Sequence, residues 1–192
     1  MSTRLSRKSS GGVTLVELVV FIVIVGVAMA GMFAAFNTMT KASADPQVRK
    51  QVLAIAESLM DEIALMPFTY CDPDDPAAAT ATGTGDCTIV ESLGPETMPG
   101  TETRYDSTFP FDNVNDYNGF SMPSGIQDIT NTAITGLDFY SVDPITITQV
   151  GTSLGLPTDA DALRISITVR GPGGVSTTLE GYRTRYAPKT LP

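Results

Sequence analysis

Hydrophobic and polar positions divide the N-terminal third of the chain into three consecutive segments. Residues 1–12 are polar and carry the basic side chains Arg4, Arg7 and Lys8, with no acidic residue. Residues 18–36 contain no charged and no hydrogen-bonding side chain. At ~1.5 Å of rise per residue, a helix over this run is nearly as long as the ~30 Å hydrocarbon core of a bilayer. The pattern predicts a membrane-spanning helix, and the basic residues before it place its N-terminal end in the cytoplasm.

The third segment, residues 37–66, is amphipathic with helical spacing. Its apolar residues recur three or four positions apart, at Val48, Val52, Ile55, Leu59 and Ile63. Asp45 followed by Pro46 is typical of a helix N-cap and first turn, so we expect a second helix over 46–66 that ends before Pro67. Alternatively, Pro46 lies as a kink inside one continuous helix. The apolar stripe predicts packing against a globular domain.

The remainder, residues 67–192, is expected to form a β-rich globular domain. Residues 67–138 are rich in Pro, Gly, Thr, Asp and Asn, which predicts irregular structure with short strands. Three later segments have β-rich composition, at 145–150, 163–170 and 175–186. The Gly-Pro-Gly-Gly sequence at 171–174 predicts a hairpin turn between the last two. We therefore predict an α+β fold, in which an antiparallel sheet of three or more strands packs on the 46–66 helix.

The composition excludes several kinds of functional site. The chain has no His and 2 Cys, which rules out a Ser–His–Asp triad, a His-ligated zinc, a thiolate zinc site and an iron–sulfur cluster. Its 12 basic and 21 acidic residues give a net charge of −9. This charge argues against nucleic-acid binding, because a phosphate backbone requires a positive surface. We expect that the protein is not an enzyme and binds no nucleic acid.

Two motifs with a superficial likeness to functional sites are interpreted as turns. Gly151, Ser153 and Gly155 match the G-x-S-x-G nucleophile elbow, but no His is present to activate the serine. Residues 112–120 superficially suggest an EF-hand loop, yet two of the ligand positions that the loop requires are not filled. Both segments are therefore expected to have a structural role.

A third motif is acidic. Asp72, Asp74 and Asp75, with Asp86 further along, offer hard oxygen ligands of the kind that Ca²⁺ prefers. The favoured interpretation is a solvated acidic loop in which aspartate before proline provides turn geometry. We therefore expect no cofactor and no metal site, with Ca²⁺ at Asp72, Asp74 and Asp75 as the alternative.

Glu17 stands at the start of the apolar run. A carboxylate at membrane depth costs about 2.5–3.5 kcal/mol on insertion scales, so it is usually retained for a partner. Its context, GG-VTLVELVVFIVIVG, resembles the N-terminal signature of type IV prepilins and type II secretion pseudopilins. In that family a membrane peptidase cleaves after the last Gly of a basic leader and methylates the new N-terminus. The resemblance implies a leader of residues 1–12, cleavage between Gly12 and Val13, N-methylation of Val13, and Glu17 as the fifth mature residue.

The resemblance also implies a pilin-like fold, with a long N-terminal helix whose first half spans the membrane and whose second half packs on the sheet. The chain then consists of the leader, a transmembrane and assembly helix over 13–36, an amphipathic helix over 37–66, and an extracytoplasmic domain over 67–192. Implied partners are prepilin peptidase, other major and minor pilins, the inner-membrane assembly platform and membrane lipids. Glu17 is expected to neutralise the N-terminal ammonium of a neighbouring subunit. The expected location is the bacterial inner membrane, in a single pass with the N-terminus cytoplasmic, and then a periplasmic or extracellular filament.

A further resemblance narrows the family. The stretch ADPQVRKQVLAIAESLMDEIALMPFTYCDPDD, residues 44–75, is similar to minor pilins of the mannose-sensitive haemagglutinin (MSHA) pilus, of the MshD type. Its AIAESLMDEI portion, residues 54–63, also resembles minor pilins of the PilV type and pseudopilins of the GspI type. We therefore expect a minor pilin or pseudopilin, assembled into an MSHA-type filament or its tip. In an oxidising compartment, Cys71 and Cys87 are expected to form a disulfide that closes a loop.

Three alternatives stay open at this point. One is a membrane-anchored extracytoplasmic binding domain, such as an adhesin, with no filament role. Another is a minor pseudopilin of type II secretion, which shares the leader and the helix. The third is a secreted soluble protein, released if signal peptidase cuts after Ala44 in the A-x-A sequence Ala42-Ser43-Ala44.

Overall fold

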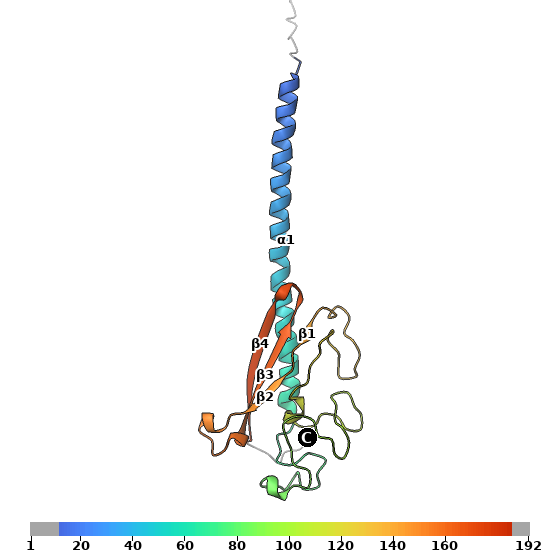
Figure 1. The fold of residues 1–192 in the computed structure, drawn as a ribbon, viewed down its shortest axis with the longest axis vertical. Helices are drawn as coiled ribbons and strands as arrows, with labels where there is room; N and C mark the ends of the chain where they lie inside the picture. Colours follow the sequence, from blue (N-terminus) through green and yellow to red (C-terminus); the bar gives the residue numbers. More distant parts are fainter. Residues whose placement is uncertain (1–11, 186–192) are drawn as a thin grey trace, which may run out of the picture. The chain divides into compact units, whose positions relative to one another are not determined.

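The computed structural model describes residues 12–185, except for the side chains of residue 38 and residues 40–45. The predicted leader, apart from its last residue, and the side chains of the A-x-A sequence lie outside the described residues. The chain forms two compact units, Met1–Ala44 and Asp45–Pro192. Helix α1, Leu15–Leu65, belongs to both units, and strands β1 to β4 belong to the second (Figure 1).

Helix α1 contains Pro46 in its interior. The prediction of a separate helix with its N-cap at Asp45 is therefore wrong, and the alternative of one continuous helix is confirmed. Proline in a helix interior removes one backbone donor and costs about 3 kcal/mol. The long apolar run before it and the amphipathic stripe after it both favour helix, and together they outweigh this local cost. The helix ends at Leu65, as expected, because the residue before Pro67 is biased away from helical conformation.

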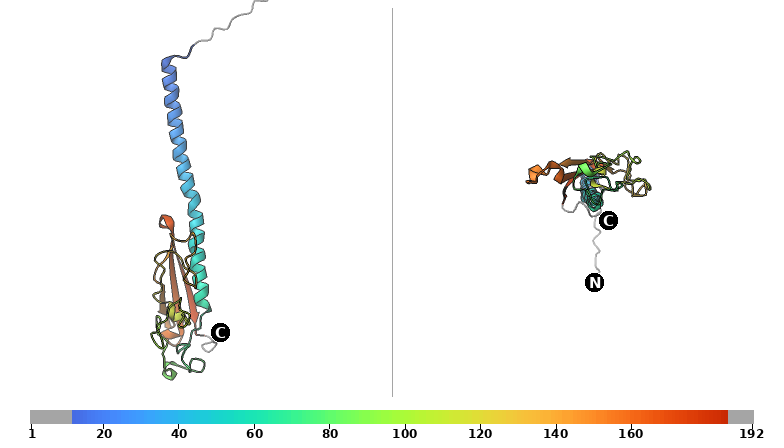
Figure 2. Two further views of the ribbon diagram at one scale, coloured as in Figure 1. Left: turned by 90° about the vertical axis from the view of Figure 1, so that its right-hand side faces the viewer. Right: turned by 90° about the horizontal axis from the view of Figure 1, so that it is seen from below.

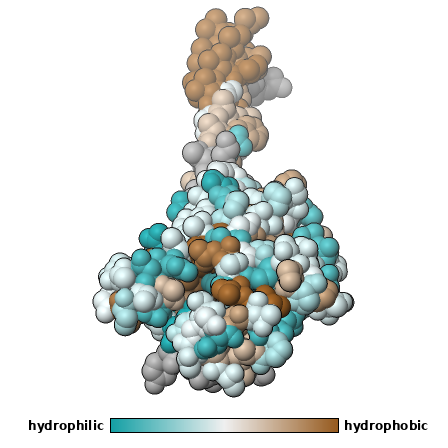
Figure 3. Space-filling model, turned by 60° about the horizontal axis from the view of Figure 1, so that its bottom comes forward, coloured by the Kyte–Doolittle hydropathy of each residue, from teal (hydrophilic) through white to brown (hydrophobic). Residues whose placement is uncertain are grey.

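The first part of α1, Leu15–Asn37, is long and apolar enough to cross a membrane, and it is the one such segment among the described residues. Its large side chains are exposed, including Phe21, Phe33 and Phe36. Figure 3 shows this apolar surface in brown at the top of the view. Removing apolar surface from water stabilises by roughly 25 cal/mol per Å². These side chains therefore favour a bilayer or other apolar helices over water.

The second unit contains a four-stranded antiparallel sheet within the described residues. Its central strand β3, Ala162–Arg170, pairs over its whole length with β4, Ser176–Thr184. The other edge of β3 pairs with β1, Ser141–Val142, and with β2, Thr146–Gln149. The predicted strands and hairpin are confirmed, and the last two glycines of the 171–174 turn have positive φ angles. Strand β1 was not predicted, because two residues are too few to show an alternation pattern.

Short 3₁₀ helices punctuate the loops of the second unit. Those among the described residues are η1 Thr84–Asp86, η2 Val114–Tyr117, η3 Thr152–Leu154, η4 Asp159–Asp161 and η5 Pro172–Gly174. The segment between α1 and β1 is otherwise irregular, as its composition predicts.

The hydrophobic core lies between the second half of α1 and the sheet, which Figure 2 shows side by side. Alternate residues of β3 are fully buried in it, namely Leu163, Ile165, Ile167 and Val169. The helix contributes the predicted stripe, with Val52, Ile55, Leu59 and Ile63 buried and Val48 partly buried at the edge. Burial of one such side chain contributes roughly 1.5–3 kcal/mol. The predicted packing of an amphipathic helix on an antiparallel sheet is confirmed.

A disulfide anchors the irregular segment near its start. Cys71 and Cys87 are bonded, as predicted, at a sequence separation of 16. Ala78 and Ala81 are buried beside Cys71 in a small cluster of their own. The bond therefore stabilises a part of the chain that contributes little to the main core.

A buried ion pair anchors the same segment to the helix. Arg104 donates from Nε to Oε1 and from Nη2 to Oε2 of Glu62, each at 2.7 Å, and its side chain is 5 % exposed. Tyr117 donates its hydroxyl to Oε1 of the same carboxylate at 2.8 Å. Arg104 also donates to the backbone carbonyls of Gln127 and Asp128. One guanidinium thus joins α1 to two parts of the irregular segment.

Removal of the disulfide should lower the free energy of unfolding by about 3 kcal/mol, because a closed loop of this length restricts the unfolded chain by that amount. The variant is Cys71→Ser with Cys87→Ser, measured by chemical denaturation of the full chain in detergent. Reduced wild-type protein is the control and should lose a similar amount. An unchanged free energy of unfolding would contradict this account.

Arg104→Gln should lower the free energy of unfolding by about 1–3 kcal/mol, because it leaves the partly buried Glu62 carboxylate without its charged partner. Replacing both residues by Gln should recover part of the loss. Arg170→Gln is the matched control, since it breaks an exposed pair with Asp143 and should cost at most about 1 kcal/mol. Equal losses from the two arginine variants would contradict the assignment.

Candidate functional site

The predicted cleavage and assembly residues lie at the start of α1. Gly12 and Val13, on either side of the predicted cut, precede the helix. Oγ1 of Thr14 accepts a hydrogen bond from the backbone N–H of Glu17 at 3.3 Å. The carbonyl of Thr14 accepts one from the N–H of Leu18 at 3.1 Å. Thr14 therefore caps the helix, and Glu17 lies in its first turn.

The first turn of a helix favours a negative charge, because its N–H groups carry partial positive charge. The sequence from Thr14 to Glu17 also has the T-x-x-E spacing of a capping box. The structure thus places an exposed carboxylate four residues after Val13. This local role of Glu17 was not predicted, although the capping signal is present in the sequence.

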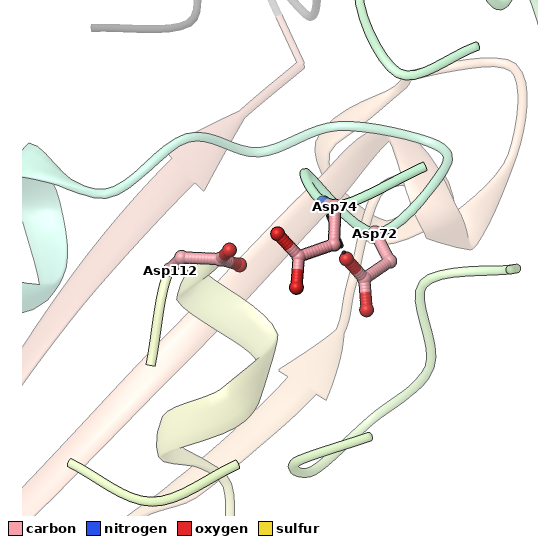
Figure 4. Close-up of side chains that lie close together, drawn as sticks. All are labelled: Asp72, Asp74 and Asp112. Atoms are coloured by element: carbon pink, nitrogen blue, oxygen red, sulfur yellow. Dashed lines mark hydrogen bonds between the residues drawn. The ribbon is translucent and has the colours of Figure 1, made fainter. Parts of the chain in front are cut away.

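A second group of side chains lies in the irregular part of the second unit. It consists of three overlapping sets, in each of which one carboxylate oxygen per residue lies within 4.8 Å of the others. The sets are Asp72, Asp74 and Asp112 (Figure 4), then Asp72, Glu96 and Glu102, and finally Glu91, Glu96 and Asp116. Because Asp72 and Glu96 each belong to two sets, the seven residues are continuous. We call them the carboxylate cluster.

Backbone turns position the aspartates of the cluster. Oδ1 of Asp72 accepts the N–H of Asp74 at 2.6 Å, in the loop that follows the disulfide. Figure 4 shows both side chains facing Asp112, which lies just before the N-cap of η2. Oδ2 of Asp116 accepts the N–H groups of Asp112 at 2.8 Å and of Asn113 at 2.7 Å. Residues 112–117 therefore form the predicted turn and also deliver two carboxylates to the cluster.

The glutamates of the cluster come from the stretch between the disulfide and η2. Oε1 of Glu96 accepts hydrogen bonds from the N–H and the hydroxyl of Ser92, each at 2.9 Å. Oε2 of Glu102 accepts the N–H of Glu96 at 3.4 Å. These bonds hold Glu96 and Glu102 beside each other, inside the cluster rather than toward solvent.

Four of the seven cluster residues are buried, and Glu91 and Asp112 are half-buried. Asp72 and Asp116 are 0 % exposed, Glu102 is 3 % and Glu96 is 8 % exposed, whereas Asp74 is exposed. The interpretation as a solvated acidic loop therefore applies to Asp74 but not to Asp72. A buried carboxylate without a compensating charge is costly, so this arrangement requires a physical explanation.

Burial and mutual repulsion raise the pKa values of these groups. Burial, with the charge of Asp116 next in importance, raises the pKa of Glu91 to about 11 and that of Glu102 to about 9. Burial also raises the pKa of Asp116 to about 8 and that of Asp112 to about 7. Each shift shows that the charged form is disfavoured in this environment. The cluster as a whole therefore favours either protons or a cation.

Asp75 and Asp86, grouped with Asp72 and Asp74 in the sequence analysis, lie outside the cluster. The carboxylate of Asp75 accepts backbone N–H groups at 2.6–2.8 Å, from Ala77, Thr88 and Ile89. These bonds, that of Ile89 above all, lower the pKa of Asp75. Asp86 accepts the N–H and hydroxyl of Thr82. Both aspartates stabilise the loop that the disulfide closes, by accepting hydrogen bonds within it or next to it.

The G-x-S-x-G segment forms a turn, as expected. Ser153 lies in η3, and its Oγ donates to the carbonyl of Val150 at 2.7 Å. The hydroxyl is thus engaged in local structure at an exposed position.

Most of the cluster was missed by sequence analysis. Its members come from three separated stretches, 72–74, 91–102 and 112–116, within irregular chain. No fixed spacing connects these stretches, so the carboxylates are brought together by tertiary structure alone. The acidic loop at 72–74 and the EF-hand-like segment 112–120 were the two signals present in the sequence.

Comparison with known proteins adds one match. Residues 7–33 match the family described as the prokaryotic N-terminal methylation motif. The matched segment includes Gly12, Val13 and Glu17. No curated protein and no solved structure matches the chain.

The motif is that of type IV prepilins, and it implies processing by prepilin peptidase and assembly with other pilins. It indicates a structural subunit rather than an enzyme. Together with the apolar segment Leu15–Asn37, it indicates a single-pass protein anchored in the inner membrane. The α+β fold, with its long helix, antiparallel sheet and disulfide, is consistent with a pilin. The methylation motif and the fold are thus both of the kind found in pilins and pseudopilins.

Proposed function

We propose that this chain is a minor pilin or pseudopilin subunit of a type IV pilus-like filament. The observation that supports this most strongly is the methylation motif over residues 7–33, joined to an apolar helix with Glu17 in its first turn. In this proposal prepilin peptidase cleaves between Gly12 and Val13 and methylates the new amino group. The N-terminus starts in the cytoplasm, and the second unit lies outside the inner membrane.

Glu17 drives assembly by electrostatic pairing. Cleavage converts the peptide nitrogen of Val13 into an ammonium at the start of the apolar helix. An ammonium and a carboxylate are each costly in hydrocarbon, and pairing removes much of that cost. A docked subunit, whose ammonium meets the Glu17 carboxylate of its neighbour, is therefore favoured over an isolated subunit. The exposed apolar side chains of Leu15–Asn37 add helix-to-helix contact.

Within this class, we propose that the chain belongs to an MSHA-type filament. This proposal rests on the resemblance of residues 44–75 to minor pilins of the MshD type. The resemblance of residues 54–63 to GspI-type pseudopilins favours type II secretion as the second candidate. Cross-linking of native membranes followed by mass spectrometry distinguishes them by the subunits that are captured. The disulfide at Cys71 and Cys87 supports an extracytoplasmic location in either case, because disulfides persist in oxidising compartments.

Intact mass and N-terminal sequencing of the protein from its native membrane should show a chain that begins at Val13 and carries one additional methyl group. A start at Asp45 would instead indicate cleavage by signal peptidase and a secreted protein. A start at Met1 would indicate an uncleaved anchor. Either of these results would contradict processing by prepilin peptidase.

Glu17→Gln should reduce the amount of the chain in filaments sheared from cells by at least tenfold, which corresponds to ~1.4 kcal/mol per docked subunit. The amount in the inner membrane should stay the same or rise, because the helix becomes less costly to insert. Glu57→Gln is the matched control, since it removes an exposed carboxylate from the same helix.

Normal assembly of the Glu17→Gln variant would rule out the pairing mechanism. It would favour the alternative of a membrane-anchored binding domain, for which the carboxylate has no role. Loss of assembly in the Glu57→Gln variant as well would point to a general charge effect on the helix.

A further inference from the structure

The carboxylate cluster has too much negative charge for the cations around it. No cluster carboxylate forms an ion pair with a basic side chain in the described part of the chain. The buried guanidinium of Arg104 is engaged by Glu62. Arg185 stacks on the rings of Phe68 and Tyr70, at 3.8 and 4.2 Å from their centroids. The charge of Arg185 acts on Glu91, but among the described residues no cluster carboxylate has a basic side chain in direct ion-pair contact.

One of the three sets in the carboxylate cluster, formed by Glu91, Glu96 and Asp116, contains several oxygens without a hydrogen-bond partner. Within residues 12–185, no hydrogen-bond partner is present for the buried atoms Oδ1 of Asp116, Oε2 of Glu96, and both carboxylate oxygens of Glu91. Asp116 and Glu96 are more than nine-tenths buried as whole side chains. One carboxylate oxygen of each of these residues lies within 4.8 Å of those of the other two. Buried polar atoms are nearly always hydrogen-bonded, so three neighbouring carboxylates that each have an unpartnered buried oxygen point to a ligand that supplies positive charge.

We propose that the carboxylate cluster is a Ca²⁺ site, with Glu91, Glu96 and Asp116 as its primary ligands. Asp72 and Glu102 lie beside Glu96 and add negative charge from the second set. The site belongs to the second unit and does not depend on filament assembly, so its test is independent of the proposed function.

The donor chemistry selects the ion. The ligands are all carboxylate oxygens, and no His or free Cys is present in the described residues, so the soft transition metals lack their preferred donors. Mg²⁺ keeps several of its waters and usually takes one or two carboxylates, whereas Ca²⁺ accepts six to eight oxygen ligands in flexible geometry. A buried set of three carboxylates, with further carboxylates adjoining, fits Ca²⁺ best.

The test uses the full chain, purified in detergent, treated with EDTA and then titrated with CaCl₂. Binding is measured by isothermal calorimetry, and thermal unfolding is followed by circular dichroism. Free Ca²⁺ at ~100 times its Kd should raise the Tm by about 5–10 °C. The absence of heat and of any Tm shift would overturn the proposal, and an equal shift with MgCl₂ would overturn the choice of calcium.

Glu91→Gln is the decisive variant, because neither carboxylate oxygen of Glu91 has a structural hydrogen bond within the described residues. It should bind Ca²⁺ at least tenfold more weakly. In EDTA it should be about as stable as the wild type, because the neutral Gln side chain resembles the protonated form of Glu91 that burial favours, and this stability shows that the variant folds. Glu180→Gln, which removes an exposed carboxylate from β4, should bind like the wild type.

Two results would contradict the ligand assignment. Wild-type affinity in the Glu91→Gln variant would exclude Glu91 from the site. An equal loss of affinity in the Glu180→Gln variant would show that general surface charge, rather than the cluster, attracts the ion.

Discussion

The apolar contact between helix α1 and strand β3 is the interaction on which the second unit depends. Val52, Ile55 and Leu59 on the helix meet the alternating buried residues of β3 in one core. The other strands are arranged around β3, which pairs with all of them. Because burial of each large aliphatic side chain contributes roughly 1.5–3 kcal/mol, this layer supplies most of the stabilisation. The irregular segment between helix and sheet also contributes buried side chains to this core, among them Phe111, Val114 and Tyr117. The disulfide and the Glu62–Arg104 pair anchor it further.

Carboxylates removed from solvent are stabilised in two different ways in the second unit. Glu62 is neutralised from within the chain, by a guanidinium that makes two hydrogen bonds to it and by the hydroxyl of Tyr117. The carboxylate cluster has no such internal partner among the described residues, and burial raises the pKa of several of its members. Burial of an unpaired charge is unfavourable, so the cluster makes the stability of this region responsive to an external cation.

Several features were predictable because they are local in sequence. The span over 18–36, the stripe from Val48 to Ile63 and the hairpin turn at 171–174 each repeat or punctuate the chain over a few residues, and the structure contains all of them. The helix boundary at Pro46 was wrong for a related reason. The local capping signal of Asp45 and Pro46 is outweighed by the strong helical preference on both of its sides.

The sequence by itself determined where the chain is apolar enough to cross a membrane, where the methylation motif lies, and which residues line the helix face toward the sheet. These are properties of composition and short-range periodicity, and they persist whatever the rest of the chain does. Tertiary structure alone decided that Glu91, Glu96 and Asp116 share one buried site, that Asp75 turns away from it, and that Arg104 reaches Glu62. Those contacts join residues far apart along irregular chain, where no period relates one position to another, so they follow from the packing of the folded domain.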